Sequence, residues 1–115
     1  MTDVAQNLAI PSKRHQDWLN CVAYIYFNNN QMDKAMSLWQ SLLKLDDSNA
    51  YGRLALCQAY LSQKSYSEAI ELAESFLGEE APPIKVYLIL SQAYWGLEQK
   101  DEARKWAALY VENNQ

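Results

Sequence analysis

The chain has 115 residues and a formal net charge of -4 at pH 7, and half of its residues are hydrophobic. This length suits one ordinary domain and excludes a multi-domain enzyme. The acidic balance argues against nucleic-acid binding, which needs a basic surface, and three glycines with three prolines are too few for a turn-rich β fold.

The first twelve residues form an N-terminal lead that carries neither the basic start nor the long apolar run of a signal peptide. Its apolar residues Val4, Leu8 and Ile10 leave two outcomes open, because the lead can fold back onto the groove described below or stay mobile. No stretch of the chain has the ~20 apolar residues needed to cross a bilayer. Cys21 and Cys57 lack metal-ligand spacing, so we expect reduced thiols in a cytoplasmic protein.

From residue 13 onward, apolar residues recur at spacings of three and four, which is typical of amphipathic helices. We predict helices over residues 13–28, 33–45, 49–62, 66–78, 83–96 and 101–113. Asp33 is expected to cap the second of these helices. Pro82 and Pro83 suit the start of the fifth, where a missing amide hydrogen is tolerated.

The same residue types return every 34 residues along the chain. Four columns share this spacing: Ala35, Ala69 and Ala103; Tyr26, Tyr60 and Tyr94; Val22, Leu56 and Leu90; and Ala23, Cys57 and Ser91. A 34-residue period with this pattern resembles the tetratricopeptide repeat, a helix-turn-helix unit. The usual turn glycine of that family is replaced by Asn30, Lys64 and Glu98, and the usual proline between repeats by Asp47 and Ala81.

The resemblance implies an all-α fold in which a tetratricopeptide domain spans residues 13–115. Its three tandem repeats, at about residues 16–48, 50–82 and 84–115, would form a short right-handed α-solenoid with a concave groove.

No catalytic set emerges from the sequence. His15 is the only histidine, and the three glycines are isolated, so neither a histidine metal pair nor a phosphate-binding loop is present. The acidic residues are interpreted as a solvated helix face; they are Glu68, Glu71, Glu74, Glu79 and Glu80. We therefore predict a protein that is not an enzyme and that uses no metal or cofactor.

The inner positions of the predicted repeats are the best candidate for a binding site. They form a groove made of Asn20, Tyr24, Phe27, Tyr51, Leu54, Gln58, Leu61, Leu88, Gln92 and Trp95. Most of these residues are apolar, which favours a groove that receives a partner segment with large apolar anchors. The alternative is that the N-terminal lead or self-association covers them. None is a cation, which disfavours clamping of a C-terminal carboxylate, and the flanking Arg53 and Lys85 are expected to be solvated.

The last predicted helix offers a second contact face, at Trp106 and Tyr110. Repeat arrays usually end with a polar capping helix, so we expect a partner or a second copy to cover this face. The alternative is that the polar residues of this helix make it able to stand alone; they are Glu102, Arg104, Lys105 and Glu112.

A small, acidic, three-repeat chain with an apolar groove resembles the export chaperones of bacterial type III secretion, and in layout the YscY-like class. That resemblance implies a cytoplasmic chaperone that holds a small secreted subunit in a heterodimer and presents it to the export gate. The alternatives are a needle-subunit chaperone of the same system, a scaffold that joins protein partners, and a self-associating subunit. An adaptor for folded proteins should have a more polar inner face.

Overall fold

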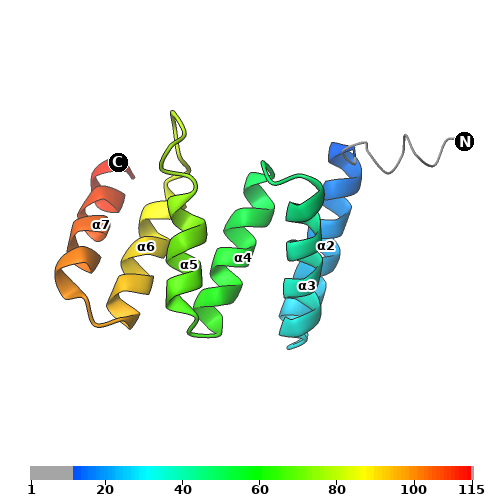
Figure 1. Cartoon of the computed structure of the whole chain (residues 1–115), viewed down its shortest axis with the longest axis horizontal. Coiled ribbons are helices and arrows are strands. Elements are labelled where there is room, and N and C mark those ends of the chain that lie inside the picture. The colour runs from blue at the N-terminus through cyan, green and yellow to red at the C-terminus, as the bar shows by residue number, and fades with distance from the viewer. Residues whose placement is uncertain (1–11, 115) are drawn as a thin grey trace, which may run out of the picture. The chain divides into compact units, whose positions relative to one another are not determined.

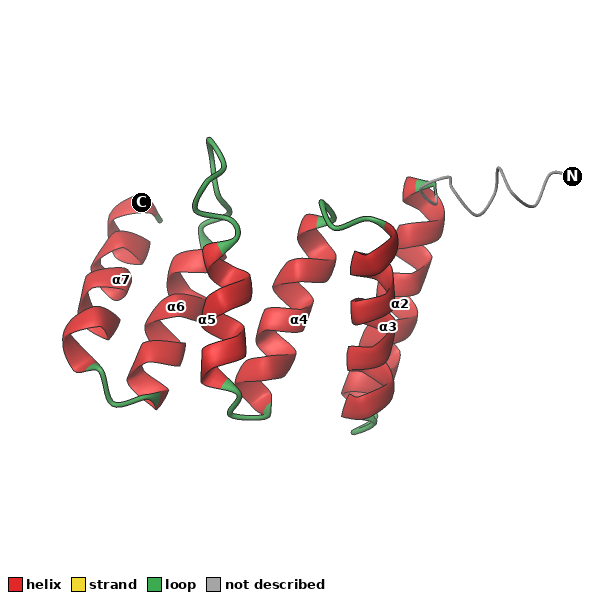
Figure 2. Cartoon of the chain, in the orientation of Figure 1, coloured by secondary structure: helices red, strands yellow, loops and turns green. Residues whose placement is uncertain are grey.

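The computed structural model describes residues 12–114, so the N-terminal lead lies outside the described residues except for Ser12. The regular structure of this part of the chain is entirely helical (Figures 1 and 2). Its helices are α2 (Lys13–Asn28), α3 (Met32–Leu45), α4 (Ala50–Ser62), α5 (Tyr66–Glu74), α6 (Lys85–Gly96) and α7 (Lys100–Asn113). The predicted all-α fold is confirmed. The chain divides into two compact units, Met1–Gly52 and Arg53–Gln115.

The predicted helix bounds agree with the structure to within two residues except at the end of α5, and α6 begins at Lys85, after Pro82 and Pro83. We expected this helix to reach residue 78, whereas it ends at Glu74. The Ser75 hydroxyl donates a hydrogen bond to the Leu72 carbonyl at 2.6 Å, and the next backbone amides bond to the carbonyl three residues back. A hydroxyl that takes a last-turn carbonyl competes with continuation of the helix, so a tighter turn follows.

The predicted cap of α3 was wrong. The capping position is Gln31, which makes no side-chain cap bond, and Asp33 lies inside the first turn. There its carboxylate is near the positive end of the helix dipole, which is a favourable place for a negative charge. Ser12 does cap α2, because its Oγ accepts a hydrogen bond from the His15 amide at 3.2 Å.

The turn inside each helix pair is the same three times. Asn30, Lys64 and Glu98 have φ values of 63°, 60° and 63°, in the left-handed region that favours glycine. The next residue donates its amide to a tyrosine carbonyl five positions back, as in a Schellman motif. These bonds are Gln31 to Tyr26 at 2.9 Å, Ser65 to Tyr60 at 2.8 Å and Gln99 to Tyr94 at 2.9 Å. The turn therefore follows the 34-residue period although the glycine is absent.

Glycine at these turns is expected to stabilise the chain. Lys64→Gly and Glu98→Gly remove a Cβ from a left-handed residue, and each should raise the free energy of unfolding by about 0.5–1 kcal/mol. Asn30→Gly should gain less, because asparagine tolerates this conformation. Urea unfolding followed by circular dichroism measures the gain. Lys105→Gly, inside α7, is the control and should lower stability; a loss in the turn variants as well would contradict the prediction.

Each unit has its own core of small and large apolar side chains. In the first unit Ala23, Ala35, Trp39 and Leu42 are buried; in the second, the larger buried side chains are Phe76, Val86, Ile89 and Leu90. The alanine column is buried throughout, with Ala35 and Ala69 at 0% exposure and Ala103 at 4%. Small residues at these positions let the paired helices approach closely.

Candidate partner-binding site

Three predicted groove residues surround Trp39, the largest buried side chain of the first unit. They are Asn20, Tyr24 and Phe27. The Trp39 indole Nε1 donates a hydrogen bond to Asn20 Oδ1 at 2.7 Å, and the Tyr24 ring meets the Trp39 ring edge to face at 5.1 Å. Phe27 lies 6.0 Å from the same ring. Partial burial raises the pKa of the Tyr24 hydroxyl. Asn20, Tyr24 and Phe27 are half-buried, so much of their contact is with the unit's own core.

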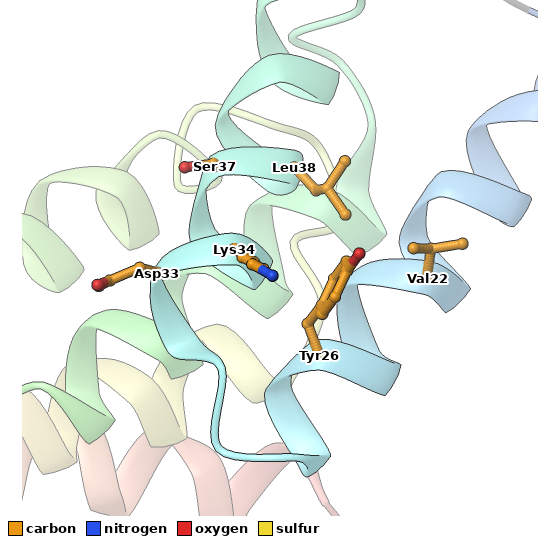
Figure 3. A pocket seen from close by; sticks show the side chains of 6 residues that line it. All are labelled: Val22, Tyr26, Asp33, Lys34, Ser37 and Leu38. Carbon is orange, nitrogen blue, oxygen red and sulfur yellow. The ribbon is translucent and has the colours of Figure 1, made fainter.

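A hollow of the first unit lies between α2 and α3. It has a volume of about 400 Å³ and is lined by Val22, Tyr26, Asp33, Lys34, Ser37 and Leu38. Figure 3 shows Val22 and Tyr26 of α2 facing Lys34 and Leu38 of α3. The Lys34 Nζ lies 5.5 Å from the centre of the Tyr26 ring, within range of a cation–π contact. The sequence analysis did not predict this hollow, because its lining combines residues of two repeat columns, Val22 and Tyr26, with polar residues of α3.

Tyr51, in the first turn of α4, is one of the exposed residues of the predicted groove. Its relative exposure is 63%, and the Lys13 Nζ lies 5.7 Å from its ring centre. In the second unit Leu54, Gln58, Leu61 and Leu88 are half-buried, whereas Gln92 and Trp95 are exposed. The predicted groove therefore includes both half-buried and open side chains, and its role in partner binding stays a prediction.

The clearest open site in the second unit is the Trp95 pocket, between α6 and α7. It has a volume of about 290 Å³ and is lined by Ser91, Gln92, Trp95, Ala103, Arg104 and Ala107. The Trp95 side chain is 61% exposed. The Ser91 hydroxyl donates a hydrogen bond to the Ala103 carbonyl at 2.8 Å, which satisfies the polar group in the pocket wall. The remaining wall combines the apolar Trp95, Ala103 and Ala107 with the polar side chains of Gln92 and Arg104.

Two cations flank the Trp95 pocket. The Lys100 Nζ lies 5.7 Å from the centre of the Trp95 ring, and Arg104 forms part of the lining. Arg104 contacts Asp101 at 3.4 Å, but both side chains are largely exposed, so this ion pair holds it weakly. Sequence analysis missed both residues. The sequence feature that could have indicated them is the turn at Glu98, because it brings the start of α7 back alongside the end of α6.

Arg53, which we expected to be solvated, is buried, so that prediction was wrong. Its guanidinium lies 3.9 Å above the centre of the Phe76 ring and contacts the Glu79 carboxylate at 2.8 Å. Glu79, which we had assigned to a solvated acidic face, is exposed and makes this ion pair. The Arg53 Nη1 also donates a hydrogen bond to the Ser75 hydroxyl at 3.4 Å, and a planar guanidinium can stack on an aromatic face while it donates to oxygen acceptors. Lys85, its predicted companion, is exposed.

The predicted C-terminal contact face is partly used within the second unit. The Trp106 ring stacks on Tyr87 of α6 with centres 6.0 Å apart, and the Lys105 Nζ lies 4.8 Å from the Trp106 ring centre. Tyr110 is half-buried, and Val111 beside it is 62% exposed. Any contact with a partner at this end of α7 would therefore involve Val111 as well as the two predicted aromatic residues.

The described part of the chain has no group of three or more metal-binding side chains. Burial raises the pKa of the Cys57 thiol to about 12, so this thiol stays protonated at neutral pH. Cys21 is exposed, and neither cysteine of the described residues forms a disulfide. Across residues 12–114, no helix has the length and apolar character needed to span a membrane.

Comparison with known proteins places the chain in a helical repeat family. The family model described as anaphase-promoting complex, cyclosome, subunit 3, matches residues 28–107, which is more than half of the chain. A search of curated proteins gave no match. Families with repeats of this type are generally non-catalytic and bind other proteins. The chain therefore belongs to the anaphase-promoting complex, cyclosome, subunit 3 family, and it carries the tetratricopeptide-like repeats expected from its 34-residue period.

Proposed function

We propose that the chain holds an apolar segment of a protein partner at the Trp95 pocket. In its finer form, the proposal is that the partner is a small secreted subunit of a bacterial type III secretion system. The chain would then act as its cytoplasmic export chaperone and present it to the export gate. The observation that carries the proposal is the Trp95 indole, 61% exposed beside a hollow of about 290 Å³.

The chemistry of the pocket indicates what kind of segment it would bind. An exposed indole beside small residues such as Ala103 and Ala107 can take up a large apolar side chain, and such pockets are typical centres of binding energy. Lys100 and Arg104 at the margin favour a carboxylate next to that side chain. An amphipathic helix of a small, aggregation-prone subunit has both features. Binding keeps such a helix soluble by mass action.

Co-expression with candidate small secreted subunits tests the proposal. Size-exclusion chromatography should show a 1:1 complex, and calorimetry should show affinity weakened about ten- to a hundredfold by Trp95→Ala. Trp95 is a better probe than Tyr24 or Leu88, because those half-buried side chains also support the fold. The matched control is Trp18→Ala, which removes an indole of similar exposure, 59%, from the first unit.

The possible outcomes separate the alternatives. Equal affinity for Trp95→Ala and the unmodified chain would show that this pocket is not the binding site. A complex that forms only with a polymerising needle subunit would identify the chain as a needle-subunit chaperone. A partner that elutes as a folded monomer without the chain would contradict a chaperone role.

The family match favours a second candidate, a scaffold that joins folded proteins. Such a scaffold should bind two partners at once, and each partner should remain soluble alone. Light scattering of mixtures containing one or both candidate partners distinguishes a ternary complex from a simple heterodimer. This arrangement would give the chain no role in secretion.

A further inference from the structure

One face of α2 is exposed although the matching face of α6 is buried. Trp18 and Ile25 on this face are each 59% exposed, and Cys21 between them is also exposed. Two 34-residue periods later, the positions of Trp18 and Ile25 hold Val86 and Ala93, and both of these are 0% exposed. The repeated helix therefore has a face that is covered in the second unit and open among the described residues of the first.

In the second unit this face is covered by a helix. α5 packs on α6, and the Tyr66 ring of α5 lies so close to Gly96, at the end of α6, that an added Cβ would overlap it. Tyr66 opens α5 whereas Gly96 closes α6, so the two helices run in opposite directions where they meet. The kind of element that fits this face is therefore an antiparallel helix.

The open face of α2 has both a projecting ring and a hollow beside it. The Trp18 ring stacks on the His15 ring with their centres 5.9 Å apart. The hollow of about 400 Å³ between α2 and α3 is large enough to receive an indole (Figure 3). Val22 lines this hollow and follows Trp18 by four residues, so the two are neighbours along the same side of the helix. One copy thus offers a large aromatic side chain and a place that can receive one.

The charges of α2 run against its own helix dipole. Its first turn contains Lys13 and Arg14 and no acidic residue, whereas α3, α5 and α7 each have an acidic first turn. A cation is unfavourable at a helix N-terminus and favourable near the C-terminal carbonyls of a helix. Asp33, in the first turn of α3 and in the lining of the hollow, adds a carboxylate near the end of α2. Neither Arg14 nor Asp33 forms an ion pair with another described residue.

We propose that the open face of α2 binds the same face of a second copy, with the two helices antiparallel about a twofold axis near Cys21. Trp18 of each copy then enters the hollow of the other, and Arg14 of each lies near Asp33 and the last carbonyls of the other α2. A twofold axis makes every such contact occur twice. A parallel pair would instead bring the two basic first turns together.

This proposal is independent of the proposed function, because the Trp95 pocket lies in the other unit. Each copy in the dimer keeps its own pocket, so the expected ratio stays at one bound segment per chain. Failure of either proposal leaves the other standing.

Sedimentation equilibrium of the full chain tests the dimer. We expect the mass of two chains at about 100 µM protein, since small interfaces are weak. Trp18→Ala should raise the dissociation constant about tenfold or more, because it removes the central aromatic side chain. The matched control is Trp95→Ala, which removes an indole of similar exposure, 61%, from the second unit and should leave the dissociation constant unchanged. Circular dichroism checks that both variants remain folded.

An exchange of charges identifies the residues that face each other. Arg14→Glu and Asp33→Lys should each weaken the dimer about tenfold, because like charges then meet across the twofold axis. In an equimolar mixture of these two variants, the mixed dimer has opposite charges at both contacts, so the affinity should return to that of the unmodified chain. Lys64→Glu is the control, since it makes the same change of charge at an exposed turn of the second unit.

Two results would overturn the proposal. The first is the mass of a single chain at the same protein concentration, which would mean that another segment of the chain or a different protein covers this face. The second is a dimer that forms equally well in Trp18→Ala, or a mixture of the charge variants that associates no better than either variant alone. Either outcome of the second kind would place the contact between copies on another face.

Discussion

Trp39→Ala is expected to lower the free energy of unfolding of the first unit by about 3–5 kcal/mol, the usual cost of deleting a buried aromatic side chain. Trp39 is 1% exposed and is the largest of the fully buried side chains. Its loss leaves a cavity next to Tyr24 and Phe27 and removes the donor that Asn20 accepts from. Urea unfolding monitored by circular dichroism measures the effect, and we expect the first unit to lose its helical signal before the second.

Trp39→Phe is the control that separates packing from hydrogen bonding. It keeps an aromatic ring in the cluster but leaves the half-buried Asn20 Oδ1 without the indole donor. The expected loss is about 1–2 kcal/mol, which is typical of a missing hydrogen bond plus a small cavity. An alanine variant as stable as the phenylalanine variant would show that the aromatic cluster does not support the first unit.

Arg53→Ala is expected to lower the stability of the second unit by about 2–3 kcal/mol, through lost stacking on Phe76 and a broken ion pair. The Arg53 side chain is 10% exposed, so its removal also opens space against the Phe76 ring. Glu79 is 44% exposed and can be solvated again, which limits the loss. Thermal and urea unfolding of the variant measure it.

Three further variants separate the contributions of stacking and of charge to this loss of stability. Arg53→Met keeps apolar volume over Phe76 and should recover part of the loss, because stacking rather than charge is the larger contribution. Glu79→Gln should cost about 1 kcal/mol or less, as expected for a half-exposed ion pair. Lys85→Ala removes an exposed cation and should be neutral. A loss at Lys85 equal to that at Arg53 would contradict the assignment of Arg53 to the interior.

The positions of the helices could be predicted because their signals are local and repeated. Apolar residues spaced three and four apart indicate a helix wherever they occur. A helix-turn-helix pattern that is weak in one repeat becomes clear because it recurs three times at a spacing of 34 residues. Lys64 and Glu98 do not by themselves indicate left-handed backbone. Their register with Asn30 does, and the structure has all three in that conformation.

The candidate site was less predictable, because periodicity places a residue on a face but does not say what covers that face. Gln92 and Trp95 were predicted groove residues and are exposed, yet Asn20 and Tyr24, predicted by the same rule, contact Trp39. In the first repeat one position of the second helix holds Trp39, which contacts Asn20 and Tyr24, whereas in the third repeat the same position holds Ala107, which lines the Trp95 pocket.

The sequence by itself determined that the chain is helical, where its helices lie and that they repeat, since these properties follow from spacing along the chain. Only the tertiary structure decided that Arg53 is an interior cation, that Asn20 accepts from Trp39 and that Trp95 stands open beside a pocket. Each of these depends on side chains brought together from different segments of the chain. Their burial and pairing arise from packing geometry, which the residue types of a single helix do not specify.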